Sequence, residues 1–153
     1  MKWMNSLKYT CGKWVLGMAD VIFEDYTINV IGAIDNRINS VLHECAGEIV
    51  SQTKRNTRVD TGKTKNSFMY YVDHIKHEAT MGSADENAIW EEFGTGEYAL
   101  NGDGRKGGWA YEDPKTGEVI WTHGKKPSRA FFKAYTSLKS KIIKRIQNSL
   151  KGL

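Results

Sequence analysis

The chain has 153 residues, of which 40% are hydrophobic and 26% charged, and its formal net charge is +4. Its length suits about one domain, and its composition is that of a folded globular protein. No apolar run approaches the roughly 18 residues that a membrane-spanning helix needs, and two cysteines, Cys11 and Cys45, cannot build a disulfide-rich scaffold. We therefore expect a soluble single domain in a reducing cytoplasm, with no membrane partner.

The charge is distributed unevenly along the chain. Residues 1–60 are neutral, residues 61–125 carry 7 basic and 11 acidic side chains, and residues 126–153 carry 8 basic and no acidic ones. Oppositely charged parts of one chain favour self-association as well as binding to an acidic partner. A solvated lysine face on the last helix explains the basic segment equally well.

The first 17 residues mix lysines with aromatic residues and show no clear period. They have neither the uninterrupted apolar segment nor the small-residue cleavage site of a signal peptide. The segment that begins at Met18 is typical of a natural protein start. We therefore expect residues 1–17 to be an extension that is poorly ordered, or at most a short helix, and residues 18–153 to form a single α+β domain.

The apolar pattern changes near Ile31. Alternation over Val21–Asn29 predicts a short strand. From about Gly32 to Asn56, apolar residues recur every three or four positions without a proline, which predicts an amphipathic helix about 35 Å long. Its apolar stripe consists of Ile31, Ile34, Ile38, Val41, Leu42, Cys45, Ile49 and Val50.

A turn at Val59–Gly62 separates this helix from a predicted β-hairpin. The hairpin runs from Phe68 to Met81, with Asp73 and His74 between its two alternating runs. Residues 88–93 then form a short element, either a strand or a single helical turn, which ends at a glycine.

The next part of the chain is a glycine-rich loop followed by a second hairpin. Residues 99–108 are polar and contain four glycines, which predicts a flexible loop that a partner could order. Residues 109–111 and 119–121 form two short strands around the turn signal of residues 113–117.

Pro127 and Ser128 open the last helix, whose C-terminal half is rich in lysine and arginine. The strands do not alternate one for one with helices. This order predicts an α+β fold, in which a long N-terminal helix and a C-terminal helix pack on a mostly antiparallel β-sheet.

Two glycine motifs imitate nucleotide-binding signatures. Gly62-Lys63-Thr64 ends like a phosphate-binding loop, but Thr57 stands where that motif needs a glycine, and we expect a helix before it and a strand after it. Residues 102–107 match GxGxxG, yet the sequence that follows predicts no helix to face a pyrophosphate. We expect neither segment to bind a nucleotide.

No other side chains form a convincing catalytic or metal-binding set. On a strand, His74 and His77 would point to opposite faces, and His43 and His123 lie in other elements. We interpret the adjacent carboxylates Glu91 and Glu92 as surface acidity, and no serine or cysteine lies in a nucleophile motif. We therefore expect a protein that is not an enzyme, with no catalytic residue, no cofactor and no metal.

Three segments, taken in order, resemble those of a known family. They are Val59–Ser67 with its VDTG start, Ala88–Thr95 with the sequence AIWEEFGT, and Thr122–Ala134 with the sequence THGKKPSRAFFKA. Their order is similar to that in phage tail-completion proteins, the small head–tail joining proteins of long-tailed bacteriophages and prophages. The likeness spans about residues 21–150. It departs from the family at Trp90, at Arg129-Ala130 in place of a second proline, and in the 109–121 hairpin.

The resemblance implies a structural virion protein without catalytic activity. It would lie at the head–tail junction of the virion, and in the host cytoplasm during assembly. It would form a homo-oligomeric ring, such as a hexamer, in contact with head-completion or connector proteins and with the tail-tube protein. DNA would pass through the lumen only as cargo.

The aromatic and basic side chains supply candidates for such an interface. A closed ring needs a heterologous contact, and the acidic central region of one subunit meeting the basic final helix of its neighbour offers one. For Trp90 and Phe93 we favour core packing over an interface role, while the two roles are equally favoured for Trp109 and Trp121. The alternative is a small basic nucleic-acid-binding protein that uses the C-terminal helix. The candidate interface residues are Trp90, Phe93, Trp109, Trp121, Arg129, Lys139, Lys144 and Arg145.

Overall fold

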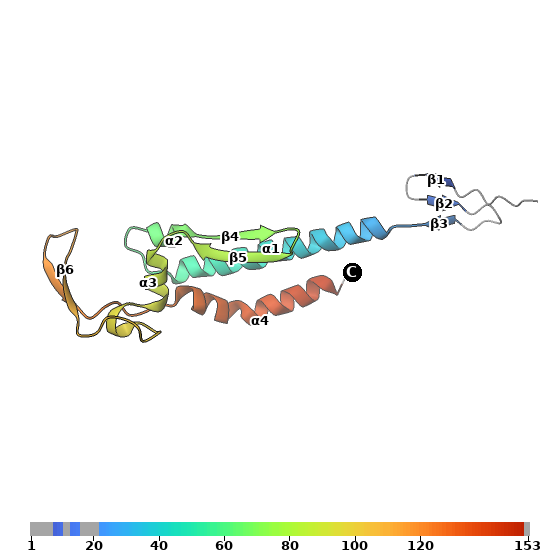
Figure 1. Ribbon diagram of the computed structural model, residues 1–153. Helices are drawn as coiled ribbons and strands as arrows, with labels where there is room; N and C mark the ends of the chain where they lie inside the picture. The colour runs from blue at the N-terminus through green and yellow to red at the C-terminus, as the bar shows by residue number, and fades with distance from the viewer. Residues whose placement is uncertain (1–7, 11–12, 16–21, 152–153) are drawn as a thin grey trace, which may run out of the picture.

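The computed structural model describes residues 8–10, 13–15 and 22–151, with side chains from residue 25 onward. Two long helices lie side by side, with a hairpin against the first of them and a second hairpin at one end (Figure 1). This is an α+β fold with antiparallel strand pairing, as predicted, although the strands fall into three small sheets. The elements are β1 (Lys8–Thr10), β2 (Lys13–Val15), β3 (Ile22–Glu24), α1 (Thr27–Asn56), α2 (Lys63–Ser67), β4 (Phe68–Asp73), β5 (Glu78–Ser83), α3 (Asn87–Phe93), the 3-10 turn η1 (Gly96–Tyr98), β6 (Trp109–Glu112), β7 (Val119–Thr122) and α4 (Ala130–Leu150).

The prediction for residues 1–17 lies largely outside the described residues. Where this segment is described, it forms β1 and β2 rather than a short helix. β1 pairs with β2, and β2 pairs with β3, in a three-stranded antiparallel sheet. The boundary between an extension and the domain stays a prediction.

Helix α1 begins earlier than the sequence pattern suggested. The predicted strand over residues 21–29 is confirmed only at β3, and the helix starts at Thr27 rather than near Gly32. The carboxylate of Asp25 accepts hydrogen bonds from the backbone N–H of Thr27, at 2.9 Å, and from its hydroxyl, at 2.5 Å, which also holds the pKa of Asp25 below its usual value. The β-branched residues between positions 28 and 34 fit both the two-residue period of a strand and the 3.6-residue period of a helix. The hydrogen bonds from Thr27 to Asp25 favour the helix.

The core lies along the C-terminal half of α1. Helix α4 packs on α1, and β4 and β5 also contact it. Val50, Phe68 and Ala88 form the buried cluster, joining α1, β4 and α3, with Met81 of β5 partly buried against it. Ala134 of α4 is fully buried, and its small side chain allows close approach of the two helices.

The first hairpin is confirmed, with a longer turn than predicted. β4 and β5 pair in register from Phe68 opposite Ser83 to Asp73 opposite Glu78, so four residues form the turn. Ile75, predicted to lie in the second strand, is in this turn and 91% exposed. The carboxylate of Asp73 accepts hydrogen bonds from the N–H groups of Ile75 and Lys76, both at 3.0 Å, which stabilises the four-residue turn.

The remaining elements follow one another along the chain in the predicted order. Residues 87–93 form a helix, α3, rather than a strand, and the second hairpin pairs Trp109 with Thr122 and Glu112 with Val119. Residues 99–108 contain no helix or strand, in agreement with the predicted loop. Among the described helices, none combines the length and apolar character that crossing a membrane requires.

Candidate assembly interface

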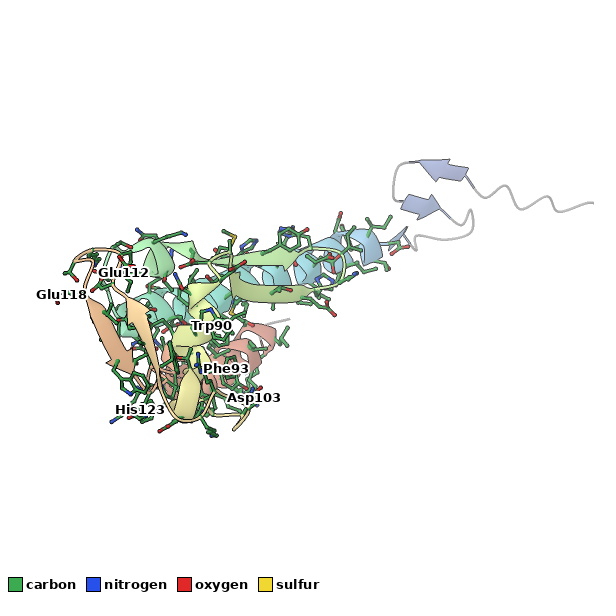
Figure 2. The ribbon with its side chains drawn as sticks, turned by 60° about the vertical axis from the view of Figure 1, so that its left-hand side comes forward. Trp90, Phe93, Asp103, Glu112, Glu118 and His123 are labelled. Atoms are coloured by element: carbon green, nitrogen blue, oxygen red, sulfur yellow. The ribbon has the colours of Figure 1, made fainter. Side chains whose placement is uncertain are left out.

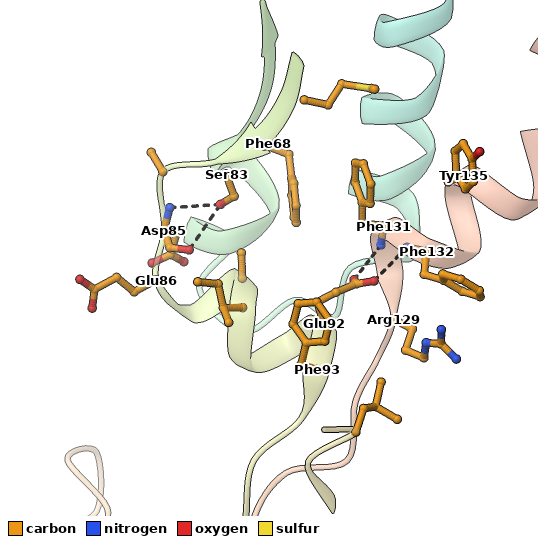
Figure 3. A pocket seen from close by; sticks show the side chains of 16 residues that line it. Phe68, Ser83, Asp85, Glu86, Glu92, Phe93, Arg129, Phe131, Phe132 and Tyr135 are labelled. Atoms are coloured by element: carbon orange, nitrogen blue, oxygen red, sulfur yellow. Dashed lines mark hydrogen bonds between the residues drawn. The ribbon is translucent and has the colours of Figure 1, made fainter. Parts of the chain in front are cut away.

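An apolar groove of about 510 Å³ opens where β5, α3 and α4 meet (Figure 3). Its walls are largely aromatic and aliphatic: Phe68 lies at its buried side, and Phe93 and Phe132 border it from α3 and α4. Exposed apolar surface of this kind is typical of protein–protein contact sites. Sequence reasoning missed the groove because its lining comes from four separate parts of the chain.

Two predicted interface residues are exposed on α3. Trp90 is 54% exposed and Phe93 46%, and Figure 2 shows both on the short helix between the two hairpins. The preferred interpretation, that these two rings pack in the core, is therefore wrong. Helix α3 has only seven residues and turns Ala88 and Glu91 inward, which leaves these rings on its outer side. Their role in an interface stays a prediction.

Glu92 anchors the start of α4. Its two carboxylate oxygens accept hydrogen bonds from the backbone N–H groups of Phe131 and Phe132, both at 2.9 Å (Figure 3). These N–H groups have no partner within the helix, and a negative charge at this end also stabilises the helix dipole. The prediction that Glu92 is merely surface acidity is therefore wrong.

Arg129 lies at the same joint, immediately before α4. Its backbone is left-handed, with a φ of 54°, and its guanidinium lies 3.8 Å from the centre of the Phe132 ring. That contact places a cation at the margin of the apolar groove, where it is half-buried. Arg129 is thus positioned to contact a molecule bound in the groove.

Glu91 is also not a surface acid. It is buried, and one of its carboxylate oxygens pairs with the ammonium of Lys125. Its backbone carbonyl accepts a hydrogen bond from the N–H of Ser128 at 2.7 Å. Together these contacts hold the segment before α4 against α3. Glu91 and Glu92 therefore both have a structural function that the sequence did not indicate.

The two tryptophans of the second hairpin differ in environment. Trp121 is 64% exposed, whereas Trp109 is half-buried against the Gly96 backbone, where an added Cβ would lie 2.8 Å from its ring. The Arg105 guanidinium lies 5.5 Å from the Trp109 ring centre. Local packing therefore accounts for Trp109, while Trp121 is open to a partner.

A basic groove of about 450 Å³ lies between α1 and α4. Glu48 of α1 accepts hydrogen bonds from Lys141 at 2.6 Å and Arg145 at 2.7 Å, which lie four residues apart on one face of α4. The hydrogen bond from Lys141 is the main reason that the pKa of Glu48 is lowered, against the opposing effect of burial. Of the predicted residues, Lys144 and Arg145 line this groove and Lys139 does not; the full lining is Arg37, Ser40, Val41, Glu44, Lys141, Lys144, Arg145, Asn148 and Ser149.

Lys139 instead contacts an aromatic ring on its own helix, since its ammonium lies 5.9 Å from the centre of the Tyr135 ring. Arg37 of α1 joins the basic face, which was not predictable from the sequence. Arg37 reaches the basic face only because α1 packs against α4, which lies about a hundred residues further along the chain.

The histidines are arranged differently from the prediction. His74 and His77 lie in the β4–β5 turn, so the argument from opposite strand faces does not apply to them. Nε2 of His74 is 3.5 Å from Nε2 of His43 on α1, and His77 contacts Asn39 of the same helix. Within the described residues, no group of three or more histidine, cysteine or acidic side chains could hold a metal ion.

In the Gly62-Lys63-Thr64 segment, Gly62 immediately precedes the short helix α2, whose first two residues are Lys63 and Thr64. A helix rather than a strand therefore begins here, which corrects one argument against a phosphate-binding loop in this segment. Its side chains are engaged within the protein. The Thr64 hydroxyl donates to Asp85 at 2.5 Å and Lys63 lies 3.7 Å from the same carboxylate. The Thr64 hydrogen bond lowers the pKa of Asp85, although burial opposes this. The pairing favours a structural role for this turn.

Residues 27–94, which run from α1 to the end of α3, match a family model of bacteriophage tail components. The model is HK97-gp10-like, described as "Bacteriophage HK97-gp10, putative tail-component". The match supports a tail-related structural component of a phage, consistent with the tail-completion proteins that the sequence resembles. No curated protein and no solved structure matches the chain.

Proposed function

We propose that this chain is a structural protein of the phage head–tail junction, which completes the tail and assembles as a homo-oligomeric ring. The observation that carries the proposal is the match of residues 27–94 to the tail-component model. In this role the protein supplies binding surfaces and performs no reaction. It lies in the virion between head and tail, and DNA passes through the ring only as cargo.

The surfaces of the molecule support assembly with several partners. The apolar groove beside α3 offers aromatic anchors, which are enriched at the centres of protein interfaces. The second hairpin and the basic groove lie in different parts of the elongated chain, so they allow head-to-tail contacts between copies (Figure 1). In this proposal the apolar groove binds a connector or tail-tube protein, and the other two surfaces join the subunits.

Gene complementation tests the proposal in a phage that encodes this chain. Particles made without the chain should accumulate as DNA-filled heads and separate tails, and wild-type protein supplied in trans should restore joining. A variant with Trp90→Ala and Phe93→Ala should fold normally and fail to complement. Ile75→Ala, which removes an apolar side chain that is 91% exposed in the distant β4–β5 turn, is the matched control and should complement. Joined, infectious particles without the chain would contradict the proposal.

A nucleic-acid-binding role is the second candidate, favoured by the four cationic side chains of the basic groove. Its signature is duplex binding that weakens steeply as the salt concentration rises. A fluorescence anisotropy titration against salt measures this directly. Tight binding by single chains near physiological salt favours this candidate over a purely structural role.

A further inference from the structure

The charges of the second hairpin and of the α1–α4 groove are complementary. We propose that the acidic tip, residues 112–118, of one copy binds in the basic groove of the next copy. This inference rests on the proposed ring and identifies the contact that would close it. The occupant of the groove is thus a second copy of this chain.

The acidic tip combines exposed carboxylates with exposed apolar side chains. Residues 112–118 hold three carboxylates against one lysine, a net charge of −2. Lys115 is paired with Asp60, since it donates to both carboxylate oxygens of that residue at 2.7 Å. Glu112 and Glu118 lie on either side of the β6–β7 turn (Figure 2), and neither forms an ion pair within the described residues. Beside these carboxylates, Val119 and Trp121 are 75% and 64% exposed. Such a mixture of charge and aromatic surface is typical of a docking element.

The basic groove offers the matching charge. Its lining contains four cations and Glu44, and the adjacent Glu48 brings its net charge to +2. Glu48 fixes Lys141 and Arg145 in place, which reduces the entropy lost when an anion binds beside them. Arg37 and Lys144 form no ion pair within the described part of the chain, so they are available to a carboxylate. Val41 adds an apolar wall.

The two surfaces cannot meet within one molecule. The hairpin lies at one end of the elongated chain, while residues 141–149 of the groove lie in the C-terminal half of α4, which points away from it (Figure 1). A tip that fits a groove at a different place on an identical molecule makes a heterologous contact. Repeated contacts of this kind close into a ring when the rotation permits.

The placement of the cations favours the acidic tip over a nucleic acid. A duplex presents a continuous row of phosphates and binds best to cations spread along a surface. Here the cations gather in a groove of about 450 Å³ with Glu44 among them, while Lys133 and Lys139 of α4 lie outside its lining. A short loop with two or three carboxylates fits such a site better.

Charge reversal tests the contact. Two variants reverse one surface each: Arg37→Glu with Lys144→Glu in the groove, and Glu112→Lys with Glu118→Lys in the tip. The four residues make no ion pair within the described chain, so the fold should persist, which circular dichroism and thermal melting verify. Sedimentation velocity should show a self-association dissociation constant at least about 10-fold weaker for each variant, and weaker wild-type association at high salt.

Combining both reversals in one chain should restore association, because the charges again match. Lys76→Glu with Lys133→Glu, which makes the same charge change outside both surfaces, is the control and should associate like wild type. Wild-type assembly that is unchanged by either reversal overturns this contact and leaves the proposed ring intact. A wild-type chain that stays single at every concentration overturns both. A groove variant that loses only duplex DNA binding assigns the groove to nucleic acid and also overturns the contact.

Discussion

Both hairpins of this protein are antiparallel strand pairs, but their surroundings are opposite. β4 turns Phe68 and Val72 into the core beside α1, whereas β6 and β7 leave Val119 and Trp121 exposed. Turn residues and alternation predict each hairpin, but they do not determine what packs against it. The helix packed against the first one makes it part of the core. Among the described residues, no helix packs on the second hairpin as α1 does on the first, and its exposed apolar surface suits a partner.

The largest expected effect on stability comes from a substitution on the buried side of the first hairpin. Phe68 is 8% exposed and joins the central cluster, so Phe68→Ala should lower the free energy of unfolding by about 3 kcal/mol through lost burial and a residual cavity. Urea unfolding followed by circular dichroism measures the change. A loss below about 1 kcal/mol would show that the first hairpin does not depend on this core contact.

The next largest effect is expected where α3 contacts the start of α4. Glu92→Ala removes both acceptors at the start of α4 and should cost about 1–2 kcal/mol. Glu92→Gln keeps one acceptor oxygen and is the matched control, with a smaller loss expected. Equal stability of Glu92→Ala and wild type in the same unfolding experiment would contradict the capping role.

A smaller effect, with a pH dependence, is expected at the contact between α1 and α4. Glu48→Gln removes the carboxylate that binds Lys141 and Arg145 and should lower Tm by roughly 2–4 °C near pH 7. The pKa of Glu48 is lowered below its usual 4.5 in the folded protein, so the unfolded chain binds more protons over that range. The stabilisation is therefore complete above about pH 5 and is lost as the pH falls through the folded pKa.

Thermal melts of both proteins from pH 3 to pH 7 test this prediction. The difference in Tm between wild type and Glu48→Gln should be constant near neutrality and shrink toward zero in acid. A difference that grows as the pH falls would contradict the lowered pKa.

The smallest effect on stability is expected at the exposed hairpin. Because Trp121 is 64% exposed, Trp121→Ala should change the free energy of unfolding by less than about 0.5 kcal/mol. The same variant should weaken self-association, measured by sedimentation velocity, because an exposed tryptophan contributes most when a partner buries it. A large loss of stability with unchanged association would reverse the roles that we assign to the two hairpins.

The sequence predicted the helices and strands more fully than the contacts between them. Apolar spacing identified most of α1, and turn residues identified both hairpins, since these are local properties of the chain. The exposure of Trp90 and Phe93 was not predictable, because seven residues of α3 are too few to show which face is buried. The role of Glu92 required its contact with Phe131, and the basic groove required the packing of α4 on α1. Such long-range contacts leave no mark on a single sequence.

Electron cryomicroscopy of the neck of phage particles that contain this chain tests the central proposal most directly. We expect a closed ring of identical copies between head and tail, with the hairpin tip of each copy against the α1–α4 groove of its neighbour. A neck that lacks this chain, or that holds it as isolated copies without mutual contact, would contradict the account.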